Sequence, residues 1–112
     1  MIAEMDPETR EKYEFVPQAI IKRPPAFFSE QGIRFETGLD DLNVYQVAEL
    51  TIDDLPFALM RHEGTPSDET TIYLPDIIAI EQLQDIINEI LTALDLPIDA
   101  LGWRRERADT PF

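Results

Sequence analysis

Hydrophobic and polar residues alternate with a period of two through the middle of the chain. The alternation is clearest over 44–52, where every second residue from Val44 to Ile52 is apolar except Gln46. This period is typical of a strand with one buried face. Comparable segments rich in β-branched and aromatic residues are separated by polar or proline-containing joints, which predicts an antiparallel meander. The expected strands are 33–37, 44–52, 57–62 and 70–74.

The period changes to that of an α-helix nearer the C-terminus. Seven apolar residues fall within an arc of about 140° on a helical projection. They are Ile80, Leu83, Ile86, Ile87, Ile90, Leu91 and Leu94. Acidic and polar residues occupy the opposite side, and Asp95 and Pro97 end the segment. The pattern predicts an amphipathic helix from about residue 80 to 94, which we expect to cover the apolar face of the sheet.

Shorter elements are expected at both ends of the meander. Asp6 followed by Pro7 predicts the start of a helix over 6–15, and a second short helix is expected after Pro25, ending before Gly32. The second of these helices carries the adjacent pair Phe27 and Phe28. The two side chains either close one end of the core or stay exposed and bind a partner. After the long helix, Leu101 and Trp103 alternate with smaller or polar residues as in a last strand, with Trp103 expected in the core.

Taken together, these elements predict the α+β class. The expected fold is an antiparallel β-meander of about four to five strands covered on one face by a C-terminal amphipathic helix, with one or two short N-terminal helices. With 112 residues, residues 1–112 are expected to form a single domain, and the ends, 1–5 and 108–112, are expected to be flexible.

The charge of the chain limits its partners. Nine basic residues against 23 acidic ones give a formal net charge of −14, which opposes binding to nucleic acid or to anionic membranes and favours a basic protein. The absence of cysteine excludes disulfides, thiol catalysis and cysteine-ligated metals. No apolar run is long enough for a membrane span, and the acidic start lacks the pattern of a signal peptide, so a cytoplasmic protein is expected.

The polar segment 62–70 gathers most of the groups that could do chemistry. His62, Glu63, Asp68 and Glu69 supply a base and carboxylates that could hold a cation, although their spacing matches no EF-hand or zincin pattern. This loop is the place where a small-ligand or metal-binding enzyme domain would have its site. No cofactor is predicted, and the acidic pairs Asp40–Asp41 and Asp53–Asp54 are interpreted as turns.

An acidic stripe follows the outer side of the predicted long helix. Glu81, Asp85 and Glu89 recur every four residues, a spacing at which like charges repel. Two explanations remain open. Either Arg104, Arg105 and Arg107 fold back onto the stripe, or the stripe is left for an external basic partner.

The charge and the shortage of catalytic groups favour a small acidic, non-catalytic protein-interaction or regulatory module. Its predicted partners are a basic protein or a second copy of the chain, and Glu81, Asp85 and Glu89 are the predicted protein-binding residues. The alternative is the small-ligand or metal-binding enzyme domain that uses the 62–70 loop.

Overall fold

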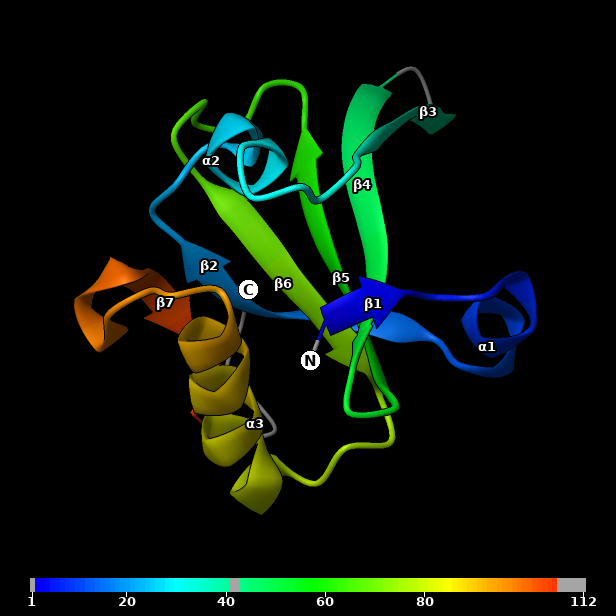
Figure 1. Cartoon of the computed structure of the whole chain (residues 1–112), viewed down its shortest axis with the longest axis vertical. Helices are drawn as coiled ribbons and strands as arrows, with labels where there is room; N and C mark the ends of the chain where they lie inside the picture. The colour runs from blue at the N-terminus through cyan, green and yellow to red at the C-terminus, as the bar shows by residue number, and fades with distance from the viewer. Residues whose placement is uncertain (1, 41–42, 107–112) are drawn as a thin grey trace.

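The computed structural model describes residues 2–40 and 43–106. These residues form one antiparallel sheet of seven strands together with three α-helices (Figure 1). In chain order the elements are β1 (Ile2–Glu4), α1 (Pro7–Lys12), β2 (Phe15–Ile21), α2 (Pro25–Ser29), β3 (Glu36–Asp40), β4 (Asn43–Ile52), β5 (Leu55–His62), β6 (Thr70–Pro75), α3 (Ile80–Ala93) and β7 (Leu101–Arg104), with a 3₁₀ turn at Ile98–Ala100.

The middle of the sheet is a meander with strands from both ends of the chain added beside it. β3, β4, β5 and β6 follow one another as antiparallel neighbours, and β2 lies between β6 and β7. β1 and β3 share one edge of β4, because β1 pairs with residues 50–52 and β3 with residues 43–47.

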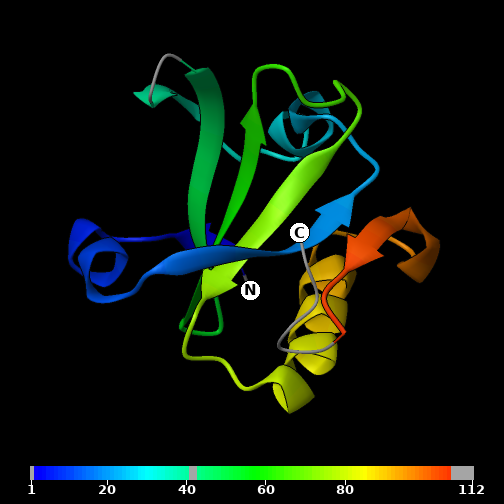
Figure 2. The same cartoon turned by 180° about the vertical axis from the view of Figure 1, so that it is seen from behind.

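The two faces of the sheet have different surroundings. We call the face that carries Ala48, Leu50 and Ile52 of β4 the core face, and the face that carries Tyr45 and Val47 the outer face. The core-face side chains form one buried cluster with Phe28 of α2 and with the apolar side of α3. Views from the two sides show α2 in front of the meander in one view (Figure 1) and behind it in the other (Figure 2).

The α+β class and the antiparallel sheet are confirmed, and so is the long helix, which runs from Ile80 to Ala93. The expected strand count of four to five is wrong, because β1 and β2 were missed. The more specific arrangement, with the C-terminal helix covering one face, is not confirmed; α2 contributes the fully buried Phe28 to the same cluster. Phe27 is partly buried against the same core.

The opening helix is shorter than the sequence predicted. α1 ends at Lys12 and Phe15 already belongs to β2. The Asp6 cap is confirmed: the backbone N–H of Thr9 donates a 2.8 Å hydrogen bond to the Asp6 carboxylate. This hydrogen bond holds the pKa of Asp6 below its ordinary value. No residue of α1 is buried, and the helix projects from the side of the molecule (Figure 1).

Some expectations concern parts of the chain that the structure leaves undescribed. The predicted flexible end 108–112, Arg107 and Asp41 lie outside the described residues. Among the described helices, none is both long and apolar enough to cross a membrane.

Candidate interaction surface

The 62–70 loop is organised by hydrogen bonds to its own backbone. Arg61 donates from Nη2 to the Thr65 carbonyl at 3.0 Å and from Nε to the Pro66 carbonyl at 3.3 Å. The Thr65 hydroxyl donates to the His62 carbonyl at 2.6 Å. These contacts hold the connection between β5 and β6 in shape, as expected for a turn whose backbone groups must be satisfied.

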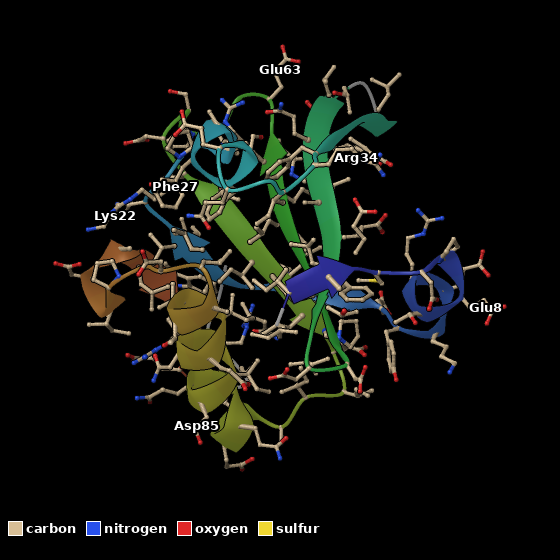
Figure 3. The ribbon with its side chains drawn as sticks, viewed as in Figure 1. Glu8, Lys22, Phe27, Arg34, Glu63 and Asp85 are labelled. Carbon is tan, nitrogen blue, oxygen red and sulfur yellow. The ribbon has the colours of Figure 1, made fainter. Side chains whose placement is uncertain are left out.

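The loop side chains that the sequence singled out are not gathered into a site. Glu63 and Asp68 are exposed, and Glu63 points away from the body (Figure 3). The His62 ring lies against Tyr45, with 5.6 Å between the ring centroids. Within residues 2–40 and 43–106, no group of three or more histidine and acidic side chains is arranged to hold a metal ion.

A hollow of about 240 Å³ lies beside the start of this loop, but His62 is not among the residues that line it. The lining residues are Thr37, Val44, Tyr45, Gln46, Arg61 and Glu63. They include one guanidinium and one carboxylate. Nucleophilic hydrolysis needs a nucleophile held by a base, and the lining residues do not provide that arrangement. The enzyme alternative for the 62–70 loop therefore stays a prediction.

One acidic pair is a turn, as interpreted. Asp53 and Asp54 join β4 to β5 with φ angles of 48° and 70°, so a two-residue turn links the paired residues Ile52 and Leu55. Positive φ at both central positions is typical of a type I′ hairpin turn, and aspartate is one of the residues that tolerate it.

The acidic stripe on α3 is fully presented to solvent. Glu81, Asp85 and Glu89 are all exposed, and Asp85 points away from the body of the protein (Figure 3). None of the three carboxylates forms an ion pair with a described residue. The opposite side of the helix carries Leu83 and Ile87, which are buried in the core, so the helix cannot turn its acidic side inward.

Arg105, which follows β7, is engaged with β2. Arg105 donates from Nε to Oε1 of the buried Gln18 at 2.7 Å and from Nη2 to the Pro17 carbonyl at 3.2 Å. Arg104 and Arg105 border a hollow of about 310 Å³ together with Glu81. Among the described residues, no base forms an ion pair with Glu81, Asp85 or Glu89, so the explanation that the arginines neutralise the stripe stays a prediction.

Sequence reasoning missed a second surface, the outer face of the sheet. A row of paired residues crosses it from β3 to β7: Glu36, Val47, Met60, Thr71, Ile20 and Trp103. Trp103 was expected in the core, but it is only partly buried, and the Arg105 guanidinium lies 5.5 Å from its ring centroid. The alternation around Leu101 and Trp103 was a usable signal for the strand but gave no information about which face it would join.

Comparisons of the chain with protein-family models, with curated proteins and with solved structures found no match.

Proposed function

We propose that the protein is a small acidic interaction module that binds a basic protein through the outward side of α3. The observation that carries the proposal is that Glu81, Asp85 and Glu89 stand one helical turn apart, exposed, without an ion pair to any described residue. Like charges at this spacing destabilise a helix by about 0.2–0.5 kcal/mol per pair. A cationic surface laid along the stripe would replace this repulsion by attraction.

The rest of the molecule supports such a partner. Residues 1–95 carry 20 acids and six bases, and residues 96–112 carry three of each, so the whole net charge of −14 precedes the tail. A field of this sign steers basic proteins toward the surface and repels polyphosphates. Because the attraction is electrostatic and exposed, it should weaken when salt is added.

The packing of α3 makes the stripe a fixed pattern of charge. Ile87 and Ile90 are completely buried, and Leu83 and Leu91 are nearly so. Side chains locked in the core hold the three carboxylates at the regular spacing of the helix, about 6 Å from one turn to the next. A partner with basic residues at helical spacing would meet all three at once without reordering the protein.

A pair of matched variants tests the location of the binding surface. The stripe variant replaces Glu81→Gln, Asp85→Asn and Glu89→Gln. The control variant makes the same kind of change in the 62–70 loop, Glu63→Gln, Asp68→Asn and Glu69→Gln. Both reduce the net charge from −14 to −11, so any difference between them reports position and not total charge.

Immobilised wild-type protein and both variants would be exposed to cell lysate at 50 mM NaCl and eluted with 500 mM NaCl. The proposal expects a basic protein that the wild type and the loop variant retain and the stripe variant loses. Equal loss in both variants would mean that only net charge matters, and loss in the loop variant alone would move the site to residues 62–70. Either of those results would overturn the proposal.

A further inference from the structure

A small apolar hollow lies between β1, the segment that follows α2 and the C-terminal end of α3 (Figure 1). Its volume is about 220 Å³, which is space for about seven water molecules. Two members of the lining, Leu50 and Leu94, are buried in the core. Ligand sites are mostly apolar with a few polar groups, so a hollow of this size and lining suits a small ligand. The lining residues are Ile2, Ala3, Glu4, Gln31, Gly32, Ile33, Leu50, Ala93 and Leu94.

The C-terminal end of α3 places hydrogen-bond acceptors at the border of this hollow. In a continuing helix the Ala93 carbonyl would accept from the residue four positions later, but that residue is Pro97, which has no N–H. Among the described residues, no donor bonds to the Ala93 carbonyl. The neighbouring Leu94 carbonyl accepts from the side-chain nitrogen of Gln31 at 3.2 Å. A hydrogen-bond donor from another part of the lining therefore already binds to this helix end.

The border of the hollow is also negative. The aligned peptide dipoles of a helix leave partial negative charge at its C-terminus, and the last turn of the 14-residue α3 has no basic residue to offset it. On the β1 side, Glu4 contributes a carboxylate to the lining. Arg34 lies 3.4 Å from that carboxylate, but the two side chains are 71% and 65% exposed, and exposed pairs of this kind contribute little. A cation with an apolar body would therefore fit the hollow better than an anion.

We propose that this hollow binds a small aliphatic primary amine in its protonated form. The hydrocarbon part would lie against Ile33, Leu50 and Leu94. The ammonium group would donate to the Ala93 carbonyl and to the Glu4 carboxylate. An ammonium group has three donors and no acceptor, which matches a border whose available side-chain and helix-end groups are acceptors. A carboxylate at the same place would meet negative charge on both sides.

The first test is an NMR titration of the full, isotopically labelled chain at pH 7 with isopentylamine, which is protonated at that pH. The methyl signals of Ile33, Leu50 and Leu94 should shift with a dissociation constant in the millimolar range, as expected for a ligand of about six heavy atoms. Isopentanol has the same apolar body without the charge and should bind about two- to fivefold more weakly. Ethylamine, with the charge but a smaller apolar body, should also bind more weakly, and isovalerate should not bind.

A pair of variants locates the site. Ala93→Leu enlarges an exposed side chain of the lining and should weaken the binding of isopentylamine at least fivefold. Gln82→Leu introduces the same side chain at an exposed position of α3 outside the lining and should leave the binding unchanged. Neither substitution changes the net charge. Circular dichroism and urea unfolding would establish that both variants are folded.

The part played by charge is tested by a second pair. Glu4→Gln and Glu8→Gln both reduce the net charge from −14 to −13, but Glu8 is an exposed residue of α1 outside the lining. Glu4→Gln should weaken the binding of isopentylamine about twofold or more and leave isopentanol unaffected, whereas Glu8→Gln should change neither. Arg34→Gln removes the cation that competes for Glu4, so it should strengthen the binding of the amine.

Three results would overturn the proposal. The first is the absence of methyl shifts at Ile33, Leu50 and Leu94 with isopentylamine up to 50 mM. The second is equal binding of isopentylamine and isopentanol, which would show that the negative border is not recognised. The third is binding that survives Ala93→Leu, which would place the amine elsewhere. Binding of a basic protein at α3 is tested separately, since the stripe variant should bind isopentylamine like the wild type and Ala93→Leu should retain the basic partner.

Discussion

The core face and the outer face are made by the same strands, yet they differ in what lies against them. On β5 the core face carries Phe57 and Leu59, which are completely buried in the cluster that also contains side chains of α2 and α3. Met60, the next residue, turns to the outer face and remains partly exposed. The comparison shows that a period-two pattern establishes the existence of two faces, whereas the packing partner of each face is determined by elements far away in the chain.

The largest expected effect is a difference in stability loss between substitutions on the two faces of β5. Leu59→Ala should lower the free energy of unfolding by about 2–5 kcal/mol, because it removes buried methyl groups and leaves a cavity. Met60→Ala should lower it by about 1 kcal/mol or less, since the side chain is already partly hydrated. Urea unfolding at about 1 µM protein measures both. Equal losses would show that the outer face is as well packed as the core face.

The second-largest effect on stability is expected at Gly38 of β3, which lies against the Tyr45 ring of β4. Gly38 pairs with Tyr45 across β3 and β4, and a Cβ at position 38 would overlap the Tyr45 ring. Gly38→Ala should therefore cost about 1–3 kcal/mol of stability by displacing that ring. The displacement should also separate the ring from His62, which NMR ring-current shifts of His62 would report.

The matched background is Tyr45→Ala, in which the space above position 38 is free. There Gly38→Ala should be neutral or slightly stabilising, because alanine suits a strand better than glycine when nothing obstructs it. A loss of the same size in both backgrounds would mean that the backbone, and not the ring, requires glycine.

Much of the fold was predictable from local patterns. The segment 80–94, which became α3 and its C-cap, has seven apolar residues on one side, and β4, β5 and β6 combine alternation with clear joints, so these elements were found within a few residues. β2 was missed because its pattern is interrupted: Pro17 breaks the hydrogen-bonding ladder, and the register shifts between Pro17 and Ala19, which leaves Gln18 buried. β1 has three residues, too few for any period to be visible.

The candidate surfaces were predictable to different degrees. The exposure of Glu81, Asp85 and Glu89 followed from the helical period alone. The outer face did not, because its central row joins residues from six strands that are paired through contacts between distant segments, such as Ile20 with Thr71 and Ile20 with Trp103. No local pattern contains that pairing, so Trp103 was assigned to the wrong environment.

A smaller effect on stability is expected at the turn between β4 and β5, which sets the register of these two strands. The Asp53–Asp54 turn aligns β4 with β5, and a slip of one residue would exchange core and outer side chains. Asp54 has a φ of 70°, a region that glycine enters without strain. Asp54→Gly should therefore raise stability by about 0.5–1 kcal/mol, which corresponds to roughly 3 °C in the unfolding midpoint.

Asp68→Gly is the control for the turn, because Asp68 is exposed and is not among the described residues with positive φ. Glycine there gives no relief of strain and adds entropy to the unfolded chain, so the midpoint should stay the same or fall. If both variants gained equally, removal of negative charge would be the cause and not the turn geometry.

The smallest expected effect is a pH dependence that comes from the outer face. Burial raises the pKa of Tyr73 above its ordinary value, because the charged phenolate loses more hydration there than the neutral phenol does. The contribution of Tyr73 to stability is therefore fully present below the unfolded-state pKa of about 10 and is lost as pH rises through the folded-state pKa. Unfolding free energies measured between pH 8 and pH 11 should fall more steeply for the wild type than for Tyr73→Phe. Equal slopes in the two proteins would show that Tyr73 is as well hydrated in the folded protein as in the unfolded chain.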